Sequence, residues 1–202
     1  MSTSSTTRRR FGVALAGAAV LLALLPGTAG ADPAPPTPST PYPSRAQSLY
    51  PSGSTALSPA GGGHGQLVAA GSTSVNIPFL EYYAIFQQSA SRVAWVGTRP
   101  LVADSIKHTD TWRVDYVAPG YIPQGVPPGA TVHSDGGATE VTWTTTAQNT
   151  WYSEHSWPYL AFFPNQYGQL YRVRYSVTGV FQFGSAFYTV TGDAAVAERS
   201  RP

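Results

Sequence analysis

The stretch YRVRYSVT at residues 171–178 alternates aromatic or aliphatic side chains with polar ones along its whole length. A period of two is typical of a β-strand that has one face buried and the other in water. The stretch TWRVDY at residues 111–116 alternates in the same way. We therefore predict an antiparallel β-fold, with Trp112, Tyr116 and Trp143 on the buried faces of its strands.

Turn signals divide the chain around these two strands into further short segments. Asp135-Gly136-Gly137 predicts a tight hairpin, and so does Gly184-Ser185. The segments between such turns that we predict as strands are residues 92–96, 131–133, 139–145, 181–183 and 187–190. Residues 119–129 are rich in Pro and Gly and predict a long loop, whereas residues 79–88 fit either a strand or two helical turns. A total of about seven or eight short strands favours a mainly β domain, an antiparallel β-sandwich or a small barrel.

The first 31 residues have the three parts of an export signal. Arg8, Arg9 and Arg10 precede an apolar run at residues 12–25, and Ala29-Gly30-Ala31 offers a cleavage site. The run is shorter than the roughly 20 residues that span a bilayer. We therefore expect a cleaved signal peptide (1–31), a secreted protein and no membrane span after cleavage. The leader resembles a twin-arginine signal, and the general secretory route remains open.

Residues 32–74 are rich in Pro, Gly and Ser and carry only two charged side chains, Asp32 and Arg45. Such a composition buries too little apolar surface to offset the entropy lost on ordering. We therefore predict a disordered tail (32–74), a β-domain (75–194) and a short C-terminal tail (195–202). The tail is either a spacer or an extended recognition segment. The residues that would anchor it to a partner are Leu49, Tyr50, Leu67 and Val68.

Charge and cysteine content exclude several classes of function. Without the three leader arginines, nine Lys and Arg stand against ten Asp and Glu, so the mature chain is close to neutral. Nucleic-acid binding needs clustered positive charge, which the sequence lacks. The absence of cysteine excludes disulfides, thiolate metal sites and a cysteine nucleophile. Arginine greatly outnumbers lysine, which is typical of a high-GC bacterial genome.

Few residues have the types and spacing of a catalytic or metal site. Asp104, His108 and Asp110 are possible ligands for zinc or a harder ion, but the segment reads as a polar surface loop. Ser153 and His155 could face the same way on an extended chain, but the surrounding sequence has no Gly-x-Ser-x-Gly elbow. We therefore expect no catalytic residues, no metal and no cofactor.

The densest feature of the sequence is a group of aromatic residues between positions 151 and 167. Prolines and the lack of a period predict a loop, or a strand–loop–strand segment. The rings either pack across one end of the domain or form an exposed contact surface for a protein or a glycan. The candidate partner-binding residues here are Trp151, Tyr152, Trp157, Tyr159, Phe162, Phe163 and Tyr167.

A leader, an extended segment and one small β-domain together form an organisation that resembles the linker subunit of secreted bacterial umbrella toxin particles. The resemblance implies a non-catalytic adaptor in an extracellular toxin complex. It also implies lectin-like and stalk subunits as partners, with the tail threading into the lectin-like one. Two other functions remain open: a cell-wall or carbohydrate-binding module that uses exposed aromatics, and an unrecognised secreted hydrolase.

Overall fold

The computed structural model describes residues 46–58, 63–77, 83–117, 120–164 and 169–197. These ranges contain strands and turns but no helix, and thus none that is long and apolar enough to cross a membrane. The predicted mainly β, antiparallel fold is confirmed. The strands are β1 (Ala46–Leu49), β2 (Ser52–Leu57), β3 (Gly65–Asn76), β4 (Ala84–Gly97), β5 (Ala103–Val117), β6 (Tyr121–Gln124), β7 (Thr131–Ser134), β8 (Ala138–Thr150), β9 (Tyr152–Pro164), β10 (Gln169–Phe183) and β11 (Ala186–Ala197).

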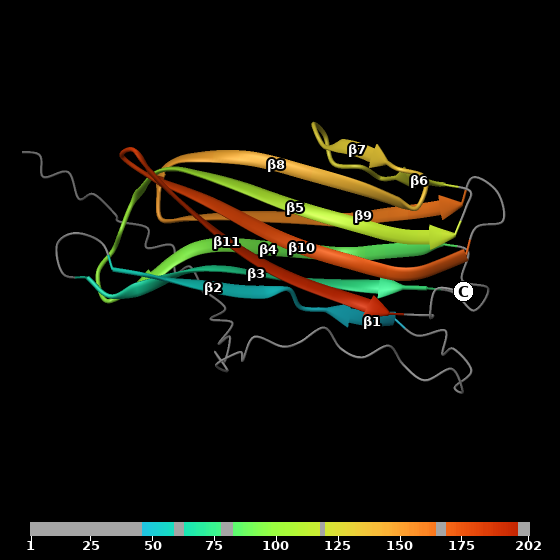
Figure 1. The fold of residues 1–202 in the computed structure, drawn as a ribbon, viewed down its shortest axis with the longest axis horizontal. Helices are drawn as coiled ribbons and strands as arrows, with labels where there is room; N and C mark the ends of the chain where they lie inside the picture. Colours follow the sequence, from blue (N-terminus) through green and yellow to red (C-terminus); the bar gives the residue numbers. More distant parts are fainter. Residues whose placement is uncertain (1–45, 59–62, 78–82, 118–119, 165–168, 198–202) are drawn as a thin grey trace, which may run out of the picture. The chain divides into compact units, whose positions relative to one another are not determined.

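The strands form one antiparallel sheet in the order β6-β9-β4-β3-β2-β11-β10-β5-β8-β7, and β1 pairs with β3 beside β2. The sheet folds over on itself, so that β10 packs across β3 and β4 (Figure 1). Side chains from the two facing layers meet in the middle. An added Cβ at Gly179 of β10, for example, would lie 2.9 Å from Val93 of β4. The result is a nearly closed, barrel-like sandwich with an interior lined by both layers.

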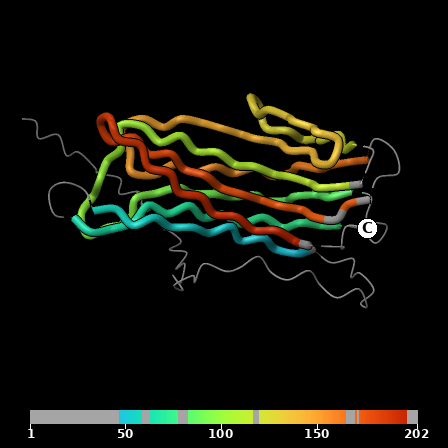
Figure 2. The backbone as a smooth tube through the Cα atoms, in the orientation of Figure 1, coloured from blue at the N-terminus to red at the C-terminus, as the bar shows by residue number. Residues whose placement is uncertain are grey.

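The two long sides of this sandwich differ: strands meet along one side, and the other side has no backbone pairing. On one side β2 meets β11 through a single pair, Ser52 with Asp193. Gly53 and Gly192 allow the two backbones to touch, since an added Cβ on Gly192 would lie 2.7 Å from the Ser52 amide nitrogen. On the other side β8 runs through a turn at residue 151 into β9 (Figure 2). Among the described residues no backbone ladder joins β8 to β9, so this side is open.

The prediction of a disordered tail across residues 32–74 is wrong for residues 46–58 and 63–74. This part of the chain forms β1, β2 and most of β3, and β3 pairs along its length with β4. Leu49 and Leu67 are buried in the core, so they are not tail anchors for a partner. Most side chains of β3 are small, so its alternation of buried and exposed residues is hard to see in the sequence. Hydrogen bonding to β4 stabilises the strand although its composition does not predict one. Residues 1–45 lie outside the described residues.

Other local predictions were refined in the same way. Residues 84–88 belong to β4, so their strand alternative is confirmed, whereas residues 78–82 lie outside the described residues. The loop predicted at residues 119–129 contains the short strand β6. The hairpin at Asp135 is confirmed, because its carboxylate accepts hydrogen bonds from the amides of Gly137 and Ala138. The described part of the chain holds eleven strands rather than about seven or eight.

The two alternating stretches that predicted the fold lie side by side. β5 pairs with β10, and the register places Trp112 directly opposite Tyr175. Both side chains are buried, and their rings stack at 5.6 Å. Tyr116 is also buried as predicted, whereas Trp143 is only half-buried at the edge of the core.

Candidate functional site

A network of polar side chains crosses the interior of the sandwich and converges on Asp110 of β5. The Asp110 side chain is 1% exposed. The Ser91 hydroxyl donates to its Oδ2 atom over 3.0 Å, and the Tyr175 hydroxyl donates to Oδ1 over 2.7 Å. The Nδ1 atom of His155 also bonds to Oδ2. Each of these three hydrogen bonds replaces part of the hydration that the buried carboxyl group of Asp110 loses.

Strand geometry explains why residues far apart in sequence meet here. The period of two places His108, Asp110 and Trp112 on the inner face of β5. On β4 a bulge re-phases the alternation, because Gln88 has a φ of 52° and the register with β3 shifts at the same place. Ser91 therefore faces inward, although a regular strand continuing from the buried Phe86 would point it outward.

His108 is fully buried and bonds to two hydroxyl groups. Its Nε2 atom lies 3.0 Å from the Ser91 hydroxyl oxygen, and its Nδ1 atom lies 3.1 Å from that of Ser153. Ser91 gives its single proton to Asp110, so Nε2 of His108 is the donor to Ser91 and Nδ1 accepts from Ser153. Burial lowers the pKa of His108 to about 4, against a weaker opposing effect of Asp110. The ring is therefore neutral at neutral pH.

His155 extends the network toward the open side of the sandwich. Its ring stacks on that of His108, with centroids 3.9 Å apart and an interplanar angle of 2°. The half-buried ring of Trp143 stacks against His155 at 4.3 Å. The Nε2 atom lies 2.6 Å from the Thr145 hydroxyl oxygen. In the neutral imidazole, Nδ1–H donates to Asp110 and Nε2 accepts from Thr145. A hydroxyl, an imidazole and a carboxylate are thus connected in series.

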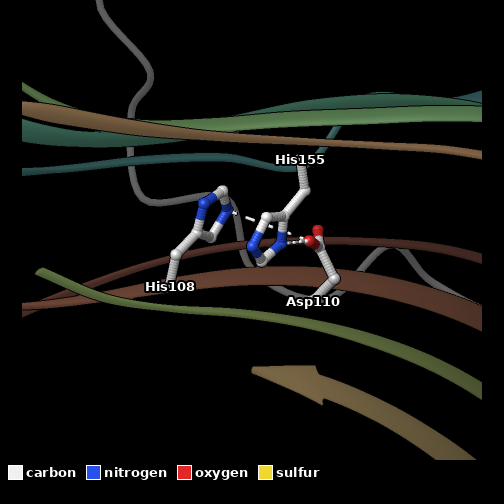
Figure 3. A group of neighbouring side chains, drawn as sticks. All are labelled: His108, Asp110 and His155. Atoms are coloured by element: carbon white, nitrogen blue, oxygen red, sulfur yellow. Dashed lines mark hydrogen bonds and ion pairs between the residues drawn. The ribbon is translucent and has the colours of Figure 1, made fainter. Parts of the chain in front are cut away.

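The proposed ligand set Asp104, His108 and Asp110 does not come together. Asp104 is exposed and accepts a hydrogen bond from the amide of Gly184 at the β10–β11 turn. The surface loop predicted for this segment is also wrong, because these residues belong to β5 and two of them are buried. His155 takes the place of Asp104 in the cluster. The possible ligand atoms of His108, Asp110 and His155 lie within 4.8 Å of one another (Figure 3).

The side-chain arrangement of this cluster does not fit a bound metal ion. A histidine nitrogen binds metal along a direction in the plane of its ring. The rings of His108 and His155 lie in parallel planes, so no single point between them lies in both planes. All four of their ring nitrogens, and both oxygens of Asp110, already have hydrogen-bond partners in the protein. The cluster is therefore a hydrogen-bonded network in which Asp110 is the shared acceptor.

Tyr175 keeps its proton in this setting. Burial raises the pKa of the Tyr175 hydroxyl, and the nearby charge of Asp110 raises it further. The hydroxyl is therefore a permanent donor to Asp110 across the accessible pH range.

A second candidate site lies on the outer surface, where β9 begins. Trp151 and Tyr152 are 41% and 37% exposed, and their ring centroids lie 4.7 Å apart. The guanidinium carbon of Arg92, on β4, lies 5.2 Å from the Trp151 ring and 4.9 Å from the Tyr152 ring. Arg92 also pairs with Glu154 at 3.5 Å. We call Arg92, Trp151, Tyr152 and Glu154 the aromatic patch.

The remaining aromatic candidates have other positions. Residues 152–164 form the continuous strand β9, so of the two alternatives the simple loop is wrong. Phe162 is fully buried, and Phe163 and Trp157 are half-buried; the Trp157 indole donates to the carbonyl of Gly125. Tyr159 is exposed, but it lies further along β9 than the aromatic patch. Tyr167 lies outside the described residues.

Of the tail candidates not in the core, Tyr50 is exposed and Val68 is half-buried on β3. Ser91, Thr145 and Tyr175 were missed as members of the buried network. Tyr175 was recognised only as a strand residue. Continuing the alternation of β5 upstream from Trp112 would have identified Asp110 and His108 as inward-facing.

No protein-family model, curated protein or solved structure matches this chain. Its function therefore has to be argued from the two sites themselves.

Proposed function

We propose that the mature chain is a secreted, non-catalytic adaptor of an extracellular protein assembly, and that it binds a protein partner through the aromatic patch. The observation that carries this proposal is the pair of exposed rings at Trp151 and Tyr152 with Arg92 placed against both. Trp, Tyr and Arg are the residue types enriched at the energetic centres of protein interfaces.

The patch is also held in place before binding. Arg92 is fixed by two rings and by Glu154, so it loses less side-chain freedom on association than an isolated arginine would. Trp151 is positioned by its backbone, because its carbonyl accepts a hydrogen bond from the Trp95 amide over 2.8 Å. A surface whose side chains are held in place favours specific over non-specific binding.

The partners in this proposal are those implied by the resemblance to toxin-particle linkers, a lectin-like subunit and a stalk subunit. Because β1, β2 and β3 belong to the sheet, we confine an N-terminal segment that threads into a partner to residues 32–45. In this version of the proposal the aromatic patch engages one subunit and residues 32–45 engage the other.

Affinity purification of the tagged protein from culture supernatant, followed by mass spectrometry, tests the proposal. We expect larger secreted proteins to co-purify with the wild type and to be lost with Trp151→Ala or Tyr152→Ala. Phe187→Ala is the matched control, because Phe187 is another exposed aromatic residue, 64% exposed on β11, and β11 pairs with neither β4 nor β9. Equal recovery of the same proteins with all variants would refute binding through the patch.

Stacking on sugar rings is an alternative use of the same two rings. The test is retention of the purified protein on insoluble cell wall or polysaccharide. Retention that Trp151→Ala abolishes and Phe187→Ala preserves would replace the protein partner with a glycan.

Hydrolysis is a second candidate function, favoured by the series Thr145–His155–Asp110. A hydroxyl next to an imidazole that a carboxylate orients is the arrangement of an activated nucleophile. Assays with activated esters test this candidate. Loss of turnover in Thr145→Ala but not in Thr144→Ala, whose side chain lies on the outer face, would support hydrolysis. Absence of turnover in the wild type would remove it.

A further inference from the structure

The free edge of β8 is unlike the other edges of the described sheet. β7 pairs with β8 only over Thr131–Ser134, opposite Thr139–Thr142. Beyond that point residues 143–150 have β5 on one side and no ladder partner on the other (Figure 1). This stretch reads WTTTAQNT and contains no charged residue and no proline.

Natural sheets usually protect their edges with charge, proline or short strand length. β1, β6 and β7 each have four residues, and β6 contains Pro123. The free part of β9 carries Glu154 and Pro158. β2 and β11 are joined by one residue pair only, but their edges face each other. Among the remaining described edges, the one at residues 143–150 is therefore the long one without such protection. An unprotected edge is a template for pairing with another strand.

We propose that residues 144–148 of β8 pair in antiparallel fashion with the same strand of a second copy of this chain, so that two sheets join across a twofold axis. Asn149 ends the usable stretch, because its φ of 50° turns the backbone out of the extended conformation.

The sequence of this edge is complementary to itself. A twofold axis through Thr146 pairs this residue with its own copy and pairs Thr144 with Gln148. Side chains on the same face then lie opposite one another, as an antiparallel ladder requires. No like charges meet, and threonine pairs across strands are favourable.

Charge also favours a second copy over a charged partner strand. The nearest charged side chain on the outer face is Lys107, which lies opposite Thr146 on the neighbouring strand β5. In the dimer two strands, β8 and its copy, lie between the two copies of Lys107 and keep them out of direct contact. An edge of five residues buries little surface, so the dimer is weak and depends on concentration.

Sedimentation velocity of the mature chain over a wide concentration range tests the proposal. We expect the wild type to shift toward the mass of a dimer as concentration rises. Thr146→Glu should weaken dimerisation at least tenfold, because two glutamates would meet at the axis. The monomer should tolerate this change, since Lys107 lies opposite the new carboxylate.

The matched control is Thr189→Glu, which adds the same charge to an exposed position on β11. It should leave dimerisation unchanged. Hydrogen exchange adds a local readout: backbone amides within residues 144–148 should exchange more slowly as wild-type concentration rises. A wild type that stays monomeric at all concentrations would overturn the proposal, and so would a Thr146→Glu variant that dimerises as strongly as wild type.

Discussion

Acidification should destabilise this protein through His108. The free imidazole has a pKa of 6.5, and in the folded state burial lowers the pKa of His108 to about 4. The unfolded chain therefore binds a proton more readily than the folded chain between these two values. The stability that depends on neutral His108 is complete above pH 6.5 and is lost as the pH falls toward 4. The pKa difference corresponds to about 3 kcal/mol.

Urea unfolding at a series of pH values between 7 and 4 measures this effect. His108→Gln is the informative variant, since an amide can bond to Ser91 and Ser153 without titrating. We expect the wild type to lose about 3 kcal/mol more than His108→Gln over this range. Groups that do not interact with His108 contribute equally to both proteins, so their effects cancel in the difference. If the two proteins lose the same stability, then His108 is not held neutral by burial and the reasoning is wrong.

Two substitutions and one metal analysis further test the interior. Tyr175→Phe should cost about 1–3 kcal/mol in urea unfolding, because it removes a donor to the buried Asp110 carboxylate; an unchanged midpoint would contradict the assigned hydrogen bond. Gly179→Ala should cost about 1–3 kcal/mol, since its new methyl group would press on Val93 across the two layers; a neutral effect would mean that the layers are further apart than described. Elemental analysis of purified protein should find no stoichiometric zinc, and added zinc should not raise the Tm. A zinc-dependent rise that His155→Ala removes would show that the stacked rings rearrange to bind metal.

Alternation identified the central strands because their buried side chains are large. Trp112 and Tyr175 stand out in phase against charged and hydroxyl-bearing neighbours, and β5 and β10 formed as expected. β3 follows the same period with Leu67, Ala69 and Thr73 facing inward. Because most of these inward-facing side chains are small or polar, the alternation of β3 is hard to recognise. The proline and glycine content of the flanking sequence therefore favours a disordered tail over a strand.

The buried network could be predicted only in part. His108 and Asp110 are two residues apart on one strand, so their common face follows from sequence. His155 joins them because β9 pairs with β4, and the register of this pairing places His155 opposite Ser91. Neither the pairing of β4 with β9 nor the bulge at Gln88 has a sequence signal strong enough to predict it. The exposure of Trp151 depends equally on the position of the β8–β9 turn.

The separation of β8 from β9 underlies each of the sites. Consecutive antiparallel strands usually form a hairpin ladder, but here the Trp151 carbonyl bonds to the Trp95 amide of β4, which commits the start of β9 to the opposite layer. With no ladder between β8 and β9, side chains close the gap, and the bond from Thr145 to His155 is one of the links across it. The same separation leaves the backbone edge of β8 free and holds the rings of Trp151 and Tyr152 at the surface. A change that let β8 and β9 pair directly would therefore remove the exposed edge and disrupt the aromatic patch together.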